Sequence, residues 1–106
     1  MRENVSESAF QSAVIDYARL KRWQVCHIRS APVTNRYGIV RTSVPYQGDV
    51  GLPDLILARA GRVLLVELKS AKGRATAEQV GWLSAAGENG RLWRPADWDT
   101  ILDELA

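Results

Sequence analysis

The sequence predicts an α/β protein in which a mixed central β-sheet is flanked by helices. Three observations predict this class: apolar residues recur at helical spacing near both ends of the chain, two near-continuous apolar runs lie close together in its middle, and turn-forming residues separate these segments. The expected order of elements is α-β-β-β-α-β-α. We expect all of it to form one domain, spanning residues 1–106.

Composition supports one folded domain outside the membrane. The chain has 106 residues, enough for a single hydrophobic core and too few for two. Hydrophobic residues make up 46% and charged residues 25%, as in ordinary globular proteins, which excludes disordered and fibrous classes. No apolar run approaches the roughly 20 residues that span a bilayer, and the N-terminus has no signal-peptide pattern. We therefore expect a cytoplasmic protein with no membrane partner.

The first half of the chain predicts a helix, a strand and a long connection. Residues 6–22 carry apolar side chains at helical spacing, and either Ser8 with Gln11 or Ser6 is placed to cap that helix. Residues 24–28, "QVCHI", favour a strand. Pro, Gly, Asn and Ser interrupt residues 30–51 too often for a regular element, although residues 37–44 are compatible with a ragged strand.

The second half predicts a β-hairpin followed by helix, strand and helix. The runs "DLILA" and "RVLLVELK" flank a turn at residues 59–62, and their lack of alternation indicates that both faces are covered. Thr76 and Gln79 form a capping box for a second helix that Gly87 ends. "RLWR" follows as a short strand, and the final helix has an apolar stripe of Trp98, Ile101, Leu102 and Leu105.

Two acidic residues and a lysine interrupt this apolar hairpin. A two-residue turn at Ala60 and Gly61 would place Asp54 directly opposite Glu67, where like charges are destabilising unless something compensates them. Lys69 would lie on the same face as Glu67. A type I turn with a bulge at Gly61 is the alternative, and it would make the opposition of the two acids diagonal.

Paired carboxylates predict a hard divalent cation, Mg²⁺ or Mn²⁺, held by Asp54, Glu67 and the Leu68 carbonyl. Such an ion activates water and neutralises charge on a phosphate, and Lys69 would orient or deprotonate that water or stabilise the transition state. A surface ion pair of Glu67 with Lys69 is the alternative. Glu7 and Gln79 also lie on core-facing stripes, although helix capping explains both equally well.

The chain resembles the PD-(D/E)XK nuclease superfamily through Pro53-Asp54 followed by Glu67-Leu68-Lys69. Over nearly its whole length it is similar to the VRR-NUC family, through "SESAFQSAVIDYARLKRW", "GLPDLILARAGRVLLVELKSAKGRATAEQVGWLSAAG" and "RLWRPADWD". The resemblance implies a restriction-endonuclease-like core. It also implies metal ligands at Glu7, Asp54 and Glu67, a catalytic lysine at Lys69 and a catalytic-site glutamine at Gln79. Gly51 and Gly73 match family glycines at close backbone approaches.

The function implied by the resemblance is phosphodiester hydrolysis in DNA. Small stand-alone VRR-NUC proteins, which occur in bacteria and phages, resemble Holliday junction resolvases that cut branched DNA as homodimers. We therefore expect a Mg²⁺- or Mn²⁺-dependent, structure-selective endonuclease. The alternatives are a general, flap- or nick-directed nuclease and a catalytically silent nucleic-acid-binding accessory protein.

Basic residues outside this signature are candidates for contacts with DNA. The net charge is only +2, but six of the fourteen basic residues crowd one third of the chain. They form either a phosphate-binding surface or a solvated basic face. Compact members of the family that the chain resembles lack most of residues 31–50, so we expect this segment to face the substrate or to form part of a dimer contact. Its candidates for contacts with DNA are Arg36, Arg41, Tyr46 and Gln47, and a solvated loop is the alternative. Lys72 and Arg74, just beyond the predicted catalytic strand, are placed to touch phosphate.

Overall fold

The computed structural model describes residues 1–29, 31–43 and 45–106. Its elements are α1 (Glu7–Leu20), β1 (Gln24–His27), β2 (Ala31–Thr34), β3 (Val40–Ser43), β4 (Leu55–Arg59), β5 (Arg62–Leu68), α2 (Ala77–Ala86), β6 (Gly90–Trp93) and α3 (Trp98–Leu105), with 3₁₀ turns at Gly87–Asn89 and Pro95–Asp97. No helix in these ranges is long and apolar enough to cross a membrane.

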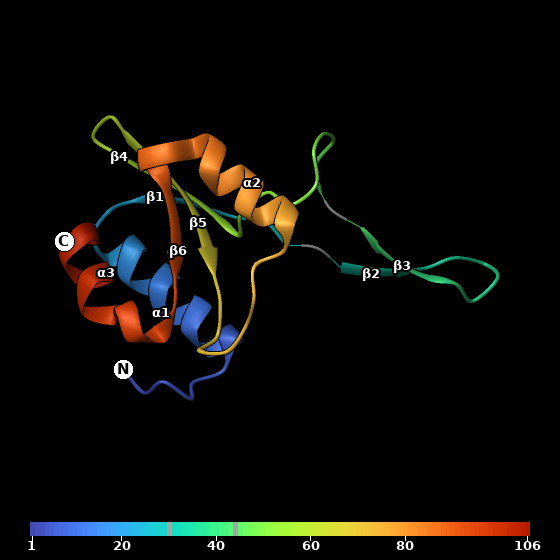
Figure 1. The fold of residues 1–106 in the computed structure, drawn as a ribbon, viewed down its shortest axis with the longest axis horizontal. Coiled ribbons are helices and arrows are strands. Elements are labelled where there is room, and N and C mark those ends of the chain that lie inside the picture. Colours follow the sequence, from blue (N-terminus) through green and yellow to red (C-terminus); the bar gives the residue numbers. More distant parts are fainter. Residues whose placement is uncertain (30, 44) are drawn as a thin grey trace.

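The predicted mixed sheet is confirmed. Four strands form it in the order β1-β4-β5-β6, in which β4 pairs antiparallel with both β1 and β5, whereas β5 and β6 are parallel. Because parallel neighbours need a crossover connection, α2 lies between β5 and β6 in the chain. Figure 1 shows α1 and α3 on one side of this sheet and α2 on the other.

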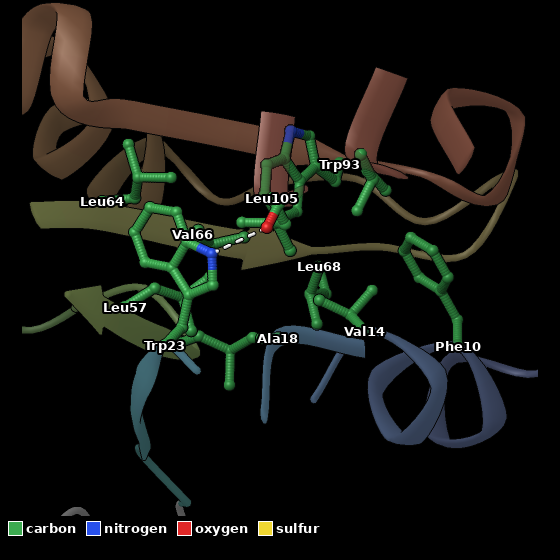
Figure 2. Packing of buried hydrophobic residues seen from close by; sticks show 12 residues of the cluster. Phe10, Val14, Ala18, Trp23, Leu57, Leu64, Val66, Leu68, Trp93 and Leu105 are labelled. Atoms are coloured by element: carbon green, nitrogen blue, oxygen red, sulfur yellow. Dashed lines mark hydrogen bonds between the residues drawn. The ribbon is translucent and has the colours of Figure 1, made fainter. Parts of the chain in front are cut away.

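The hydrophobic core lies between the sheet and the α1–α3 layer, as Figure 2 shows. Alternate residues of β5, namely Leu64, Val66 and Leu68, point into it, because successive side chains of a strand face opposite ways. They pack with Phe10 and Val14 of α1. Helix α2 contributes no fully buried residue, so the opposite face of the sheet is only partly covered and leaves room for polar side chains.

The β4–β5 hairpin closes through the two-residue turn rather than through a bulge. Ala60 has φ +50° and Gly61 has φ +82°, the positive values that a type I′ turn requires. The register pairs Arg59 with Arg62 and Ile56 with Leu65. Between the two turn possibilities, the structure therefore selects the one in which the pairing, continued by one residue, sets Asp54 opposite Glu67.

Helix boundaries follow their capping residues. Ser6 caps α1, because its Oγ accepts the Ala9 N–H at 3.1 Å, so the alternative cap is correct and the Ser8–Gln11 capping box is wrong. The Thr76–Gln79 capping box of α2 is confirmed in both directions. Gly87, with φ +59°, ends that helix as predicted.

The expectation that residues 30–51 are interrupted too often for a regular element is wrong at residues 31–34 and 40–43, which form strands. Strands β2 and β3 form a separate antiparallel hairpin in which Val33 pairs with Arg41 and Thr34 with Val40. Only the ragged strand expected at residues 37–44 anticipates part of it, and Val44 lies outside the described residues. Residues 33–41, the part of this hairpin whose side chains are described, are all exposed, so no buried face among them would leave a period-two apolar pattern in the sequence.

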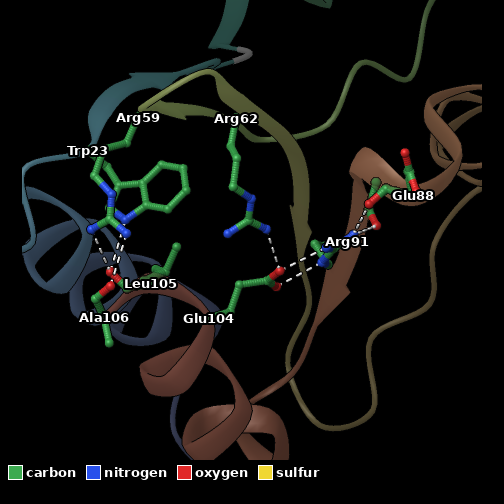
Figure 3. A network of polar contacts seen from close by, with 9 residues as sticks. Trp23, Arg59, Arg62, Glu88, Arg91, Glu104, Leu105 and Ala106 are labelled. Carbon is green, nitrogen blue, oxygen red and sulfur yellow. Dashed lines mark hydrogen bonds and ion pairs between the residues drawn. The ribbon is translucent and has the colours of Figure 1, made fainter.

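Arg59 joins the ends of α1 and α3 (Figure 3). Its guanidinium donates to the carbonyl oxygens of Lys21, Leu105 and Ala106 at 2.9, 3.1 and 2.9 Å, and it lies 4.5 Å from the centroid of the Trp23 ring. Carbonyls near a helix C-terminus lack intrahelical partners, and a cation there also matches the helix dipole. This contact fastens the helical layer to the turn end of β4.

Candidate functional site

Asp54 and Glu67 lie at the end of the β4–β5 hairpin that is remote from its turn. Continuing the observed register by one residue beyond Leu55 and Val66 makes them direct neighbours on adjacent strands. Residues facing each other across an antiparallel pair share a face of the sheet, so both side chains stand on the α2 side, away from the core. Two like charges are thus held together by the strand pairing itself.

Asp54 is fixed by hydrogen bonds to both neighbouring strands. Its Oδ2 accepts the Leu68 N–H at 2.9 Å, and its backbone carbonyl accepts the Ile28 N–H at 2.7 Å. The Asp54 carboxylate therefore accepts the hydrogen bond from β5 that a backbone carbonyl of the neighbouring strand would otherwise accept. Within a strand residue the N–H and C=O point the same way, so the Leu68 carbonyl also faces the Asp54 side.

Glu67 is the one charged residue among the buried polar side chains of the described ranges. It is 1% exposed, and its Oε1 has no hydrogen-bond partner. Burial, reinforced by the Asp54 carboxylate, raises the pKa of Glu67 from 4.5 to about 7, although the Lys69 ammonium opposes the rise. A buried oxygen without a donor is costly, so either a proton shared with the Asp54 carboxylate or a bound cation would stabilise this atom.

Lys69 stands beside Glu67 as the sequence predicts. Its Nζ lies 3.3 Å from Oε2 of Glu67, and its side chain is largely buried. The backbone N–H of Lys69 donates to the Trp93 carbonyl at 3.0 Å, which extends the β5–β6 ladder past the last strand residue. Strand pairing thus fixes the main chain of Lys69, and its ammonium lies beside the Glu67 carboxylate.

The donors at this site fit a hard divalent cation. Carboxylate oxygens, a backbone carbonyl and a free oxygen lone pair are the ligands that Mg²⁺ and Mn²⁺ prefer. Within the described ranges, however, no group of three or more His, Cys, Asp or Glu side chains is arranged to hold a metal ion. Asp54, Glu67 and the Leu68 carbonyl would thus form a protein half-shell, with water or substrate completing it.

Glu7 and Gln79 do not join the Asp54–Glu67 pair: Glu7 lies elsewhere, and the side chain of Gln79 caps a helix. Glu7 is exposed in the first turn of α1, next to the cap residue Ser6, and among the described residues no group of three or more His, Cys, Asp or Glu side chains includes it. Gln79 uses its Oε1 to accept the Thr76 N–H at 2.8 Å, which is its capping role. Of the predicted site residues, the sheet brings together Asp54, Glu67, Leu68 and Lys69.

The segment before Asp54 is packed against the start of α2. A Cβ on Gly51 would lie 2.6 Å from both the carbonyl carbon and the Cβ of Glu78, and Gly51 has φ +92°. Nearby, the Tyr46 hydroxyl accepts the Leu52 N–H at 3.2 Å, so this predicted DNA-contacting residue also shapes the loop. The close approach expected at Gly51 is confirmed, and it positions the chain entering Asp54.

The remaining predicted DNA-contacting residues are exposed on two surfaces. Lys72 and Arg74 lie on the loop after β5, and Arg36, Arg41 and Gln47 belong to the segment containing the β2–β3 hairpin. Arg94 holds the first of these loops by donating to the carbonyls of Ser70 and Gly73 at 2.7 and 2.6 Å. Sequence reasoning missed Arg94, because a basic residue ending a short strand carries no pattern that indicates such contacts.

Comparisons of the chain with protein-family models, with curated proteins and with solved structures gave no match. The function must therefore be argued from the chemistry of the site.

Proposed function

We propose that the protein is a Mg²⁺- or Mn²⁺-dependent endonuclease that hydrolyses phosphodiester bonds in DNA. One observation carries the proposal: the buried Oε1 of Glu67 lacks a hydrogen-bond partner while a second carboxylate and an ammonium adjoin it. The VRR-NUC-like motifs of the sequence support the same reaction.

The side chains divide the work. Asp54, Glu67 and the Leu68 carbonyl would hold the cation, which when bound would supply Lewis acidity toward a phosphate. Lys69, fixed 3.3 Å from Glu67, would orient the attacking water or offset negative charge that develops on phosphorus. Glu67 must be ionised to act as a ligand, and its raised pKa makes metal affinity rise with pH up to about 7.

We also propose that the substrate is branched DNA, with Holliday junctions as the first candidate, and that the enzyme acts as a homodimer. A two-fold dimer would present two sites to a symmetric junction. Duplex, flap and nicked DNA are the alternative substrates. A silent nucleic-acid-binding protein is the alternative from another class, and the free Glu67 oxygen argues against it.

A cleavage assay with matched variants tests the reaction. Labelled four-way junctions, duplexes, flaps and single strands are incubated with Mg²⁺, Mn²⁺ or EDTA and with the native protein, Lys69→Ala or Asp54→Asn. We expect metal-dependent paired nicks in junctions from the native protein alone. Equal cutting of every form would leave a general nuclease, and no cutting by a folded native protein would favour the silent binding protein.

Metal binding gives an independent readout. Mn²⁺ is titrated calorimetrically at pH 8 into the native protein, Glu67→Gln and the control Glu88→Gln, whose parent side chain is exposed. The native protein and the control should bind Mn²⁺, whereas Glu67→Gln should lose at least tenfold in affinity. Equal affinities for all three would place the metal elsewhere and remove the basis of the proposed reaction.

A further inference from the structure

The β2–β3 hairpin projects away from the rest of the molecule (Figure 1). The protein is accordingly elongated, with principal extents of 48, 31 and 25 Å. Residues 33–41, the part of the hairpin whose side chains are described, are all exposed and lie outside the core cluster. The hairpin is thus an arm, defined here as residues 31–43, and its own packing on the domain does not explain it.

Both faces of the arm carry exposed apolar side chains. Val33 and Val40 lie on opposite faces and are 51% and 63% exposed, and Tyr37 at the tip is 72% exposed. A two-stranded hairpin without a covering layer is only marginally stable in water. These observations indicate that a binding partner covers the arm.

Charge favours a polyanion as that partner. Residues 31–43 contain two basic and no acidic residues, whereas the whole chain contains fourteen basic and twelve acidic residues. Arg36 and Arg41 on the arm are both exposed. Arginine matches phosphate with a planar fork of donors, and the major groove of DNA admits a two-stranded β-ribbon.

The tip of the arm is preorganised to present a cation and an aromatic ring. Asn35 Oδ1 accepts the N–H groups of Tyr37 and Ile39 at 2.9 and 3.0 Å, which fixes the turn. The Arg36 guanidinium lies 4.9 Å from the centroid of the Tyr37 ring. A rigid tip loses little entropy when it binds, so Arg36 is ready for a phosphate and Tyr37 for the groove wall.

The root of the arm adjoins the carboxylate pair. The outgoing chain is tied there by the bond from the Ile28 N–H to the Asp54 carbonyl. The returning chain passes Gly51, packed on α2, and enters Asp54 through the buried Pro53. A duplex held by the arm would therefore run past the candidate metal ligands.

We propose that the β2–β3 arm lies in a groove of duplex DNA, with Arg36 and Arg41 contacting phosphates beside the bond to be cut. This inference rests on the proposed nuclease function and adds to it the element that positions the substrate. It also accounts for the exposed apolar residues, because the arm is covered when DNA is bound.

Binding of a fluorescent blunt duplex in EDTA tests the arm. Affinity is measured by anisotropy over a range of salt concentrations for the native protein, Arg36→Gln/Arg41→Gln, and the control Arg19→Gln/Arg62→Gln. The control removes the same charge at the end of the sheet near the β4–β5 turn. We expect the arm variant to lose at least tenfold in affinity and its salt slope to fall by about two, as for two lost phosphate contacts. The control should change affinity by less than threefold.

Other outcomes separate the hypotheses. If the arm variant and the control have equal affinities while the native protein binds and cuts DNA, the DNA-binding role of the arm is overturned and the proposed nuclease function stands. If the native protein does not bind DNA, the DNA-binding role of the arm is overturned. If it also does not cut DNA, the proposed nuclease function is overturned as well. Sedimentation addresses the competing partner, a second copy: a native dimer that becomes monomeric in Tyr37→Ala with unchanged DNA affinity would make the arm a dimer contact and refute groove binding.

Discussion

Nζ of Lys69 lies 3.3 Å from Oε2 of Glu67, while Oε1 of the same carboxylate is buried without a partner. The ion pair thus provides a partner for one of the two carboxylate oxygens of Glu67. The pKa of Glu67 stays raised, to about 7, because burial and the Asp54 carboxylate outweigh the single ammonium. Ionisation of Glu67 therefore destabilises this site, and a bound cation would stabilise it.

Ionisation of Glu67 should cost stability in metal-free protein. Since its pKa rises from 4.5 to about 7 on folding, the folded state binds the proton more tightly, and stability falls as pH increases through that window. Glu67→Gln should match the native protein near pH 4 and exceed it by up to about 3 kcal/mol at pH 8. Urea unfolding in EDTA measures the difference. A gap that is constant with pH would contradict the assignment, and Glu88→Gln is the control.

The β4–β5 turn contains a correctable strain. Ala60 has φ +50°, a region that costs a residue with a Cβ roughly 1 kcal/mol and that asparagine and glycine tolerate. Ala60→Asn should therefore raise the free energy of unfolding by about 0.5 to 1 kcal/mol, whereas Ala60→Val should lower it. Thermal and urea unfolding measure both changes. A destabilised Ala60→Asn would argue against the type I′ turn.

Arg59 should matter far more to stability than its neighbour Arg62. Arg59→Ala removes the donor to the Lys21 and Ala106 carbonyls, leaves the Leu105 carbonyl with Trp23 Nε1 as its remaining side-chain donor, and removes the contact with the Trp23 ring, a loss of about 2 to 4 kcal/mol. Arg62→Ala removes an exposed ion pair with Glu104 and should cost less than about 1 kcal/mol. Equal losses in urea unfolding would contradict this ranking.

Gly51 should be intolerant of a side chain for steric reasons. Gly51→Ala places a methyl group 2.6 Å from Glu78 and should destabilise the protein by about 2 kcal/mol or more. Gly38→Ala is the matched control, because Gly38 also has positive φ, +77°, but has nothing within 4 Å of the added atom. It should cost only about 1 kcal/mol. Similar losses would show that the backbone conformation, and not the contact with α2, is what requires glycine at residue 51.

Local patterns account for the elements that the sequence predicts well. The apolar runs around Ala60–Gly61 define the β4–β5 hairpin, and the shortness of its turn fixes the register that sets Asp54 against Glu67. The Thr76–Gln79 box defines the start of α2. In each case the information lies within a few residues, so one chain is enough to read it.

Sequence patterns do not predict features that depend on residues far apart in the chain. The described side chains of the β2–β3 hairpin, those of residues 33–41, are all exposed, so alternation of buried and exposed residues gives no signal there. The roles of Arg59 and Arg94 depend on carbonyls that are 21 to 47 positions away in the chain. The lone oxygen of Glu67 is likewise a property of packing. A pattern identifies Glu67 as unusual, and only coordinates identify which atom lacks a partner.

The helical layer over the core is assembled from opposite ends of the chain. Tyr17 and Trp23 donate to the carbonyls of Leu102 and Leu105, 85 and 82 positions later. During translation, the sheet face that carries Leu57, Leu64 and Val66 therefore has no α3 to cover it until residues 98–105 have been synthesised. The core can close only after this helix has left the ribosome, so its long-range contacts form after the hairpin that they cover.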